Sequence, residues 1–239
     1  MSNIIAAAGL ILLRQNTATK QFEVLLLKRN AKLRVHGGNW VFPGGKVDAQ
    51  DYQALNHIPS EIDLKNPPTL SPSDYLKLMT QTAMRETLEE AGITINAAQP
   101  QYFSRWLTPK VLAKRFDTCF FIAQLSNKEV IVDGSEIVDY QWISPAKSLA
   151  LHAQGKIAMP PATFVSLNCL NQFPKAQSAI TELCKDPVHY RPKLISNEKG
   201  LCSLYEEDAA YQNENLLMTG KRHRLEMNAG HFNYISAYK

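Results

Sequence analysis

The stretch AMRETLEEAGI, residues 83–93, concentrates charged side chains whose types and spacing could do chemistry. Arg85, Glu86, Glu89 and Glu90 fall within six positions, and residues three or four apart share one face of an α-helix. Arg85 can pair with Glu89, but carboxylates this close still repel one another. The hard cations Mg²⁺ and Mn²⁺ bind oxygen ligands and would compensate them. A solvated helical surface is the plainer reading of the same charge run.

The preceding residues predict a long helix that carries these side chains. Ser71 can cap its N-terminus, Pro72 suits the first helical position, and Asp74 falls in the first turn. Gly92 suits the left-handed conformation with which many helices end. Small and apolar residues at three- to four-residue spacing predict the inward face: Leu76, Met79, Ala83, Thr87 and Ala91.

Short apolar runs elsewhere predict strands around this helix, and prolines and glycines predict the turns. We expect strands over residues 4–14, 22–29, 93–95, 101–108, 116–125 and 136–144, with weaker ones in 189–196, 200–207 and 221–236. A tight loop is expected at residues 43–45 and irregular chain over 52–70, where prolines are frequent. Two further helices are expected over residues 144–154 and 160–173.

The segment RETLEEAGI resembles the second half of the Nudix box, Gly-x5-Glu-x7-Arg-Glu-U-x-Glu-Glu-x-Gly-U, where U is apolar or Thr. The first half is similar to PGGKVDAQD, in which five residues separate Gly45 from Asp51. Two departures stand out, because the family's glutamate is Asp51 here, and 33 residues rather than seven separate it from the arginine. Asp48 is an equally plausible acid for this loop.

With its insertion inside the box, the chain resembles one Nudix subgroup, the acyl-coenzyme A diphosphatases. The similarity extends over roughly residues 5–173. It is strongest in RFDTCFF and PPAT, residues 115–121 and 160–163. The resemblance implies an α/β fold, the Nudix α/β/α sandwich with a mixed β-sheet. It also implies a Nudix hydrolase domain over residues 1–183, with residues 52–80 as an insertion within the box and residues 184–239 as a C-terminal extension.

The resemblance further implies a metal site and a set of catalytic residues. Glu86 and Glu90 would be direct metal ligands, Glu89 a ligand directly or through water, and Gly45 a carbonyl donor from its glycine loop. Arg85 would belong to the catalytic set. The general base stays open among Glu86, Glu89 and Glu136, and Glu136 is as readily explained as an acid at a strand edge.

Basic side chains in the flanking segments would bind the substrate. Arginine grips phosphate with two hydrogen bonds, so we expect a pyrophosphate and a 3′-phosphate to be held by Arg29, Arg34, Arg105 and Arg115. His36 lies among basic and glycine residues and is a weaker candidate. Trp106 and Phe116 could stack on an adenine, but their spacing equally suits the core.

The expected reaction is metal-dependent hydrolysis of coenzyme A or an acyl-coenzyme A to 3′,5′-ADP and (acyl-)4′-phosphopantetheine, with Mg²⁺ or Mn²⁺ as cofactor. The alternatives are a Nudix hydrolase acting on ADP-ribose or a dinucleotide, and a non-catalytic Nudix domain that senses a nucleotide. The box alone does not separate the two substrate classes, because it contacts only the pyrophosphate. Retention of the helix glutamates argues against the sensor.

The bulk composition agrees with a small-molecule enzyme. The chain has 239 residues, 45% of them hydrophobic and 20% charged, and a net charge of +4 that suits phosphate ligands but is too small to indicate nucleic-acid binding. Four cysteines without a CxxC pair are expected to be buried thiols: Cys119, Cys169, Cys184 and Cys202. The apolar run from Ile4 lacks signal-peptide features, so we expect a cytoplasmic protein without a membrane partner. The oligomeric state stays open, a homodimer included.

Overall fold

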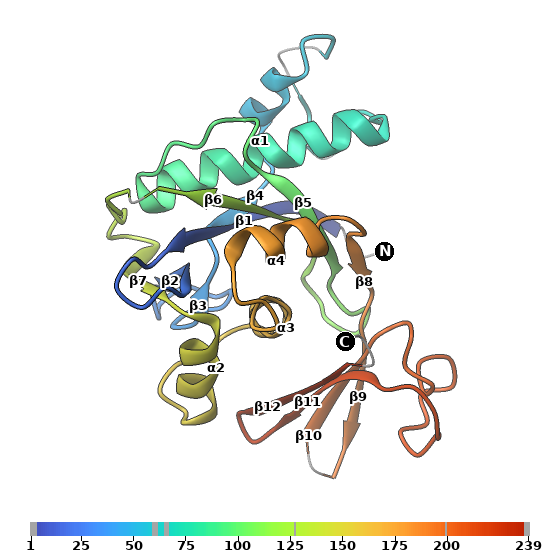
Figure 1. The fold of residues 1–239 in the computed structure, drawn as a ribbon. Helices are drawn as coiled ribbons and strands as arrows, with labels where there is room; N and C mark the ends of the chain where they lie inside the picture. The colour runs from blue at the N-terminus through green and yellow to red at the C-terminus, as the bar shows by residue number, and fades with distance from the viewer. Residues whose placement is uncertain (1–3, 59–61, 65–66, 127, 199, 237–239) are drawn as a thin grey trace.

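A mixed sheet lies between helix α1 on one face and helices α2, α3 and α4 on the other (Figure 1). The computed structural model describes residues 4–58, 62–64, 67–126, 128–198 and 200–236. In these residues the main sheet has eight strands: β1 (Ile4–Gln15), β2 (Phe22–Arg29), β3 (Trp40–Val41), β4 (Gly44–Lys46), β5 (Gln101–Leu107), β6 (Arg115–Leu125), β7 (Ile137–Ile143) and β8 (Val188–Tyr190). The helices are η1 (Ala49–Ala54, a 3₁₀ helix), α1 (Pro72–Ala91), α2 (Pro145–Ala153), α3 (Pro161–Leu170) and α4 (Ala176–Leu183). The expected α/β/α sandwich with a mixed sheet is confirmed.

Strand β1 organises the main sheet. It pairs in parallel with β6 from Ile4 opposite Arg115 to Arg14 opposite Leu125, and antiparallel with β2 and β4. Its continuous apolar run is typical of a strand that is buried on both faces. Alternate side chains therefore enter two different cores, Leu10 and Leu12 under α1, and Ile11 and Leu13 on the opposite face.

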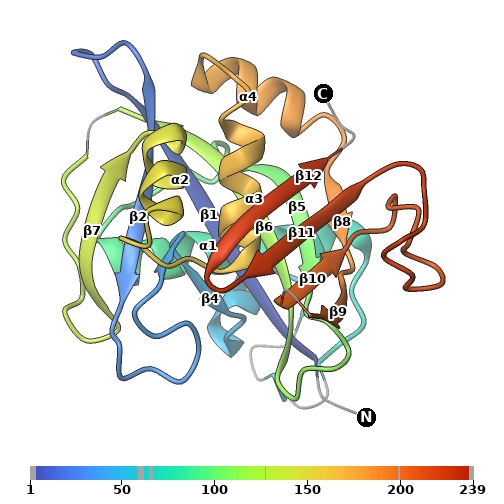
Figure 2. The same ribbon diagram turned by 90° about the horizontal axis from the view of Figure 1, so that it is seen from below.

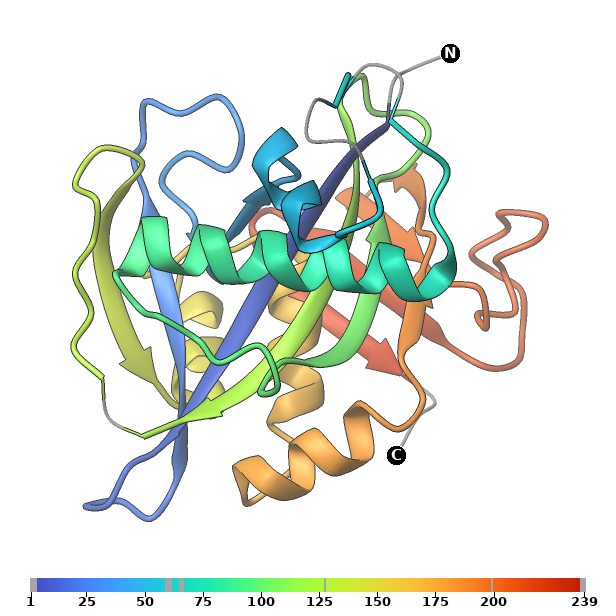
Figure 3. The same cartoon turned by 90° about the horizontal axis from the view of Figure 1, so that it is seen from above.

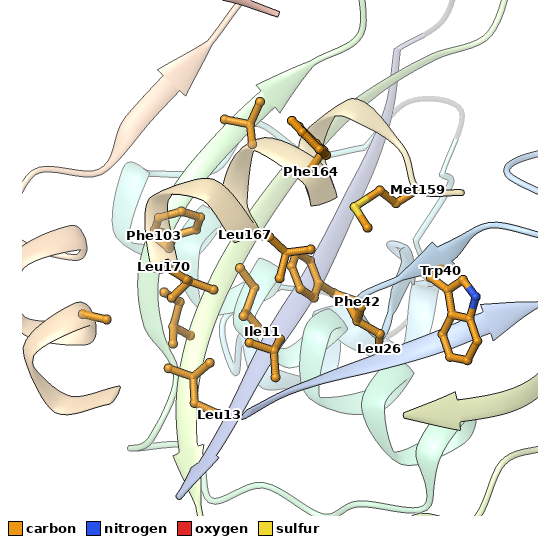
Figure 4. Close-up of a cluster of buried hydrophobic side chains, with 14 of the residues drawn as sticks. Ile11, Leu13, Leu26, Trp40, Phe42, Phe103, Met159, Phe164, Leu167 and Leu170 are labelled. Carbon is orange, nitrogen blue, oxygen red and sulfur yellow. The ribbon is translucent and has the colours of Figure 1, made fainter. Parts of the chain in front are cut away.

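The two cores hold the helices in place. On one face, Phe164, Leu167 and Leu170 of α3 pack among side chains of the sheet, together with Phe103 (Figure 4). On the other face, the buried side of α1 packs on β1 and β6 through Leu78, Met79 and Ala83. Because this second core fixes α1 against β1 and β4, it also fixes the charged face of the helix.

Both predicted ends of helix α1 are confirmed. The Ser71 hydroxyl accepts a hydrogen bond from the Asp74 amide, Pro72 is the first helical residue, and Gly92 ends the helix in the left-handed conformation with φ 68°. The last residues of the predicted insertion, 72–80, form the first turns of this helix. Helix η1, at the start of the insertion, packs against α1 (Figure 3), so this part of the insertion lies beside the charged face.

Some sequence predictions for the strands were wrong. Residues 93–95 belong to no strand in the described chain, although Ile93 and Ile95 are buried, because alternating apolar residues indicate burial and not ladder pairing. The loop predicted at residues 43–45 is in part strand β4, in which Gly44 and Gly45 lie opposite Gly9 and Ala8 of β1. The missing side chain of Gly44 permits this close approach, because a Cβ atom there would lie 2.5 Å from the Ala8 carbonyl oxygen.

A second, four-stranded antiparallel sheet follows the main sheet in the chain (Figure 2). It consists of β9 (Lys193–Asn197), β10 (Gly200–Leu204), β11 (His223–Asn228) and β12 (His231–Ser236). The strand predicted over residues 189–196 is divided, since β8 joins the main sheet and β9 the second, with Pro192, which lacks an amide proton, between them. The extension predicted from residue 184 therefore contributes to both sheets, and the domain boundary itself stays a prediction.

The described part of the chain contains no helix long and apolar enough to cross a membrane. All four cysteines lie in described residues as free thiols. Cys119 and Cys202 are buried, as expected, whereas Cys169 and Cys184 are only partly buried.

Candidate active site

The two halves of the box meet at Asp51, despite the 34 positions that separate this residue from Arg85. The Arg85 guanidinium donates to the Asp51 carboxylate from Nε at 2.8 Å and from Nη2 at 3.0 Å. The Thr82 hydroxyl and the Asp48 amide donate to the same carboxylate at 2.9 and 2.8 Å, and Asp51 is only 1% exposed. The Asp48 side chain instead caps η1 by accepting from the Gln50 amide. The structure therefore assigns Asp51, not Asp48, as the partner of Arg85.

Arg85 also orients the glutamates of its own helix. Its Nη1 lies 2.9 Å from Glu89 Oε2, which confirms the expected pair four residues apart, and 3.0 Å from Glu86 Oε1. Its Nη2 donates to the Lys46 carbonyl of β4 at 2.9 Å. These contacts to carboxylates and backbone join η1, β4 and α1, and the place of Arg85 in the catalytic set stays a prediction.

Two carboxylates of α1 lie close to the glycines of β4. The Gly44 amide donates to Glu90 Oε2 at 2.9 Å. A Cβ atom on Gly45 would lie only 2.3 Å from the Glu86 carboxyl carbon, so this position has no room for a side chain. The Glu86 carboxylate thus explains the glycine at position 45, whereas the nearby backbone of Ala8 and Gly9 in β1 explains the glycine at position 44.

Both of these carboxyls hold protons more tightly than usual. The pKa of Glu90 is raised to about 8, mainly by burial and then by the charges of Glu86 and Glu136, and this net value includes the lowering effects of the Gly44 amide and Arg29. Burial likewise raises the pKa of Glu86, although Arg85 lowers it. Glu90 is 5% exposed, so water contributes little to the stabilisation of its negative charge, which depends on protein groups or a bound cation.

The donor chemistry of this site fits a divalent cation. Glu86, Glu90 and the adjacent β4 backbone supply hard oxygen atoms, and the raised pKa values show that negative charge here lacks compensation. The expected convergence of three carboxylates is not seen: in the described residues no three Asp, Glu, His or Cys side chains form a ready ligand group. Glu89 turns to Arg85 and its side chain is 52% exposed, so its role as a ligand stays a prediction.

Arg29, at the end of β2, brings a third element to the site. Its Nη1 lies 3.3 Å from Glu90 Oε1 and its Nη2 3.3 Å from Glu136 Oε2, while Nε donates to the Val35 carbonyl. The Glu136 side chain is 60% exposed and precedes β7 in a turn held by the Asp133 carboxylate. Three predicted site residues from distant parts of the sequence are thus in contact.

The other predicted substrate-binding residues do not join this cluster. Arg34 and His36 lie in the loop between β2 and β3 with much of their surface exposed. Partial desolvation of the imidazole ring and then the Arg29 charge lower the pKa of His36. Arg105 pairs with Asp117 at 2.8 and 2.6 Å and lies over the Tyr75 ring. Arg115 is buried and donates to a backbone carbonyl, that of Thr108. Their phosphate-binding roles stay predictions.

The two aromatic candidates have structural surroundings. Trp106 is buried and stacks on Tyr190 with ring centroids 3.9 Å apart, so the reading of Trp106 as a core residue is the better one. Phe116 is partly buried, and the Lys114 ammonium lies 5.3 Å from its ring centroid. Sequence reasoning missed Thr82, whose signal was a polar residue on the inward face of a helix, three positions before Arg85.

Replacing Gly45 by alanine should impair activity without unfolding the protein. The new methyl group must displace the Glu86 carboxylate, which is the flexible end of a side chain, so we expect kcat/KM to fall roughly 10- to 100-fold with little change in Tm. Gly44→Ala is the contrasting variant, because its methyl group would meet the Ala8 carbonyl oxygen at 2.5 Å. That variant should lower Tm by several degrees. Equal Tm losses in both variants would contradict this distinction.

The raised pKa of Glu90 predicts how stability depends on pH. The pKa is about 8 in the folded protein and roughly 4.3 in an unfolded chain, so between these values the folded state binds more protons. The free energy of unfolding therefore falls as pH rises through this window. We expect the Tm of chelator-treated protein to fall by several degrees between pH 6 and 9, and Mg²⁺ to oppose the fall. The same slope in Glu90→Gln would assign it to other groups.

Comparisons with known proteins agree with this geometry. A family model described as the NUDIX domain matches residues 77–163, which include the charged face of α1 and Glu136. A protein of Xenopus laevis named acyl-coenzyme A diphosphatase NUDT19 is 26% identical, over 87% of this chain and 76% of its own. The protein of that name from Homo sapiens is also 26% identical, over 99% of this chain and 88% of its own. The crystal structure of a NUDIX hydrolase from Alicyclobacillus acidocaldarius superposes with a TM-score of 0.64 at 23% identity, covering 78% of this chain and 100% of that one, and shares the fold.

Proposed function

The chain belongs to the Nudix hydrolase family and is a pyrophosphohydrolase, and from this premise we propose that its substrate is coenzyme A or an acyl-coenzyme A. The similarity to the human acyl-coenzyme A diphosphatase along 99% of the chain carries this proposal. A match confined to the box would support pyrophosphate hydrolysis but would not indicate the rest of the substrate. This match extends through the insertion and the C-terminal sheet. The products would be 3′,5′-ADP and (acyl-)4′-phosphopantetheine.

The proposed metal ligands are Glu86 and Glu90, with the Gly45 carbonyl and Glu89 as further donors. A bound Mg²⁺ or Mn²⁺ would neutralise charge on the diphosphate and lower the pKa of a water molecule. The contacts of Arg85 with Glu86 and Asp51 support a role in fixing the first ligand. Burial of Glu90 and its hydrogen bond from Gly44 support a similarly fixed second ligand.

The proposed reaction is attack of water on one phosphorus atom of the diphosphate. The oxygen of the water forms a bond to phosphorus, the bridging P–O bond breaks, and a carboxylate takes the proton. Glu86, Glu89 and Glu136 are the candidates for this base. Arg29, which contacts Glu90 and Glu136, is the proposed phosphate contact at the carboxylates, and Arg34, His36, Arg105 and Arg115 are further proposed contacts.

The test is a side-by-side assay of coenzyme A, an acyl-coenzyme A and ADP-ribose with Mg²⁺ or Mn²⁺, with products identified by chromatography. Formation of 3′,5′-ADP from the first two, abolished in Glu90→Gln and by a chelator, would support the proposal. Cleavage of ADP-ribose alone would keep the proposed metal chemistry and reject the substrate. No turnover of any of the three, in a protein that still binds one of them, would favour a sensor.

A further inference from the structure

Arg29 occupies the position of a counter-cation for the acidic site. One guanidinium nitrogen contacts Glu90 and another contacts Glu136, both at 3.3 Å, and these two glutamates come from α1 and from the turn before β7. The Arg29 side chain is itself mostly buried. The protein thus supplies a positive charge from its own chain to the most deeply buried of the three glutamates on this face of α1.

A divalent cation bound by Glu90 would compete with Arg29 for the same carboxylate. Glu90 Oε2 accepts from the Gly44 amide, and Glu90 Oε1 faces Arg29, so both oxygen atoms are already engaged. A cation bound by Glu90 would lie beside the guanidinium, and the two positive groups would repel each other. Binding of the cation would therefore weaken the interaction that holds Arg29 at Glu90.

The contacts of Arg29 would allow its guanidinium to change partners. Both contacts to carboxylates are long, and the Glu136 side chain opens to solvent. Nε donates to the Val35 carbonyl at 3.3 Å, which ties the base of the guanidinium to the loop between β2 and β3. A guanidinium released from the glutamates would keep this tether and could present two parallel N–H groups to a diphosphate.

We propose that Arg29 is an exchangeable counter-cation, which holds Glu90 and Glu136 in the metal-free protein and turns to the diphosphate of the substrate when a divalent cation takes its place. This inference rests on the proposed diphosphate chemistry but not on the nucleotide that carries the diphosphate. It makes the binding of metal and of diphosphate positively coupled. A bound metal ion frees Arg29 from Glu90 for the diphosphate, and a bound diphosphate withdraws Arg29 from Glu90, which then is free for the metal ion.

The test measures binding rather than turnover. Isothermal titration of Mn²⁺ and of methylene-diphosphonate, a diphosphate with a P–C–P bridge that resists hydrolysis, compares wild type with Arg29→Gln. The matched control is Arg14→Gln, which removes an arginine of the neighbouring strand that pairs with Glu23 at 2.8 Å and lies over the Trp142 ring. We expect Arg29→Gln to bind Mn²⁺ at least about 5-fold more tightly. Without metal, Arg29→Gln should bind the diphosphonate as tightly as wild type does. With Mn²⁺ present, it should bind the diphosphonate about 10-fold more weakly than wild type. Arg14→Gln should change neither the Mn²⁺ affinity nor the diphosphonate affinity.

Two outcomes would overturn the proposal. An equal loss of diphosphonate affinity with and without Mn²⁺ would make Arg29 a fixed phosphate contact. No loss in either state would make it a structural partner of Glu90 only. The probe carries no nucleoside, so failure of the coenzyme A assignment would leave these affinities unchanged, and the two failures are distinguishable. Arg29→Lys, which keeps the charge but not the two-pronged geometry, should recover less than half of the metal-dependent loss in binding free energy if the guanidinium grips both oxygens.

Discussion

Replacing Glu90 by glutamine is expected to lower kcat/KM on the order of 10³-fold, the scale of losing a principal charge-stabilising group. Glutamine has nearly the same shape and its carbonyl can still accept the Gly44 amide, so the fold should persist. What disappears is the negative charge, which lies 5% exposed beside Glu86 and which the proposed cation would require. Steady-state kinetics with saturating Mg²⁺ would measure the loss.

Glu89→Gln is the matched control on the same helix. The Glu89 side chain is 52% exposed and its partner in the structure is Arg85, so its removal should cost less than the removal of Glu90. We expect a loss of about 10-fold or less if Glu89 acts only through Arg85. Activity within 10-fold of wild type for Glu90→Gln, or a larger loss for Glu89→Gln, would relocate the metal site toward the exposed end of the cluster.

Replacing Asp51 by alanine is expected to destabilise the protein by roughly 3–5 kcal/mol, because it leaves the Arg85 guanidinium without its buried partner. The Thr82 hydroxyl and the Asp48 amide would lose their acceptor as well. For a chain of this size the loss corresponds to a decrease in Tm of about 10 °C. Thermal unfolding followed by circular dichroism would measure it.

Asp48→Ala is the control for this prediction. Asp48 is exposed and its side chain caps the short helix η1, so its removal should cost only about 1 kcal/mol. A larger loss from Asp48 than from Asp51 would contradict the assignment of Asp51 as the anchor of the box. Asp51→Glu, which restores the residue of the family motif, tests whether the shorter side chain is required by the buried position.

The sequence was sufficient for features that are decided locally. Both ends of α1 follow from Ser71, Pro72 and Gly92, because capping depends on neighbouring residues alone. The buried runs of β1 and β2 were equally clear. Helix α4 was missed, because its N-cap residue, Lys175, makes no side-chain capping hydrogen bond and is not a residue type that indicates a helix start.

Contacts between distant residues were beyond the sequence. Asp48 and Asp51 were equivalent acids until the packing of η1 on α1 buried one and exposed the other. From the sequence, Arg105 was available to bind phosphate, but in the fold it forms an ion pair with Asp117 on the neighbouring strand. The bridge of Arg29 between Glu90 and Glu136 joins positions 61 and 107 residues apart. A motif predicts which side chains occur, whereas the sheet decides which of them meet.

The insertion inside the box also affects how the site assembles. In the family motif the acid and the arginine are eight positions apart, and here they are 34 apart. Each doubling of a loop adds roughly 0.6 kcal/mol of closure entropy, so joining the two halves costs about 1.2 kcal/mol more than in an uninterrupted box. Burial of Tyr52 and Leu55 in the core under α1 can offset this cost. The Asp51–Arg85 contact thereby becomes a non-local one, which we expect to form after the helix itself. Hydrogen exchange should therefore find η1 opening more readily than the helix it anchors.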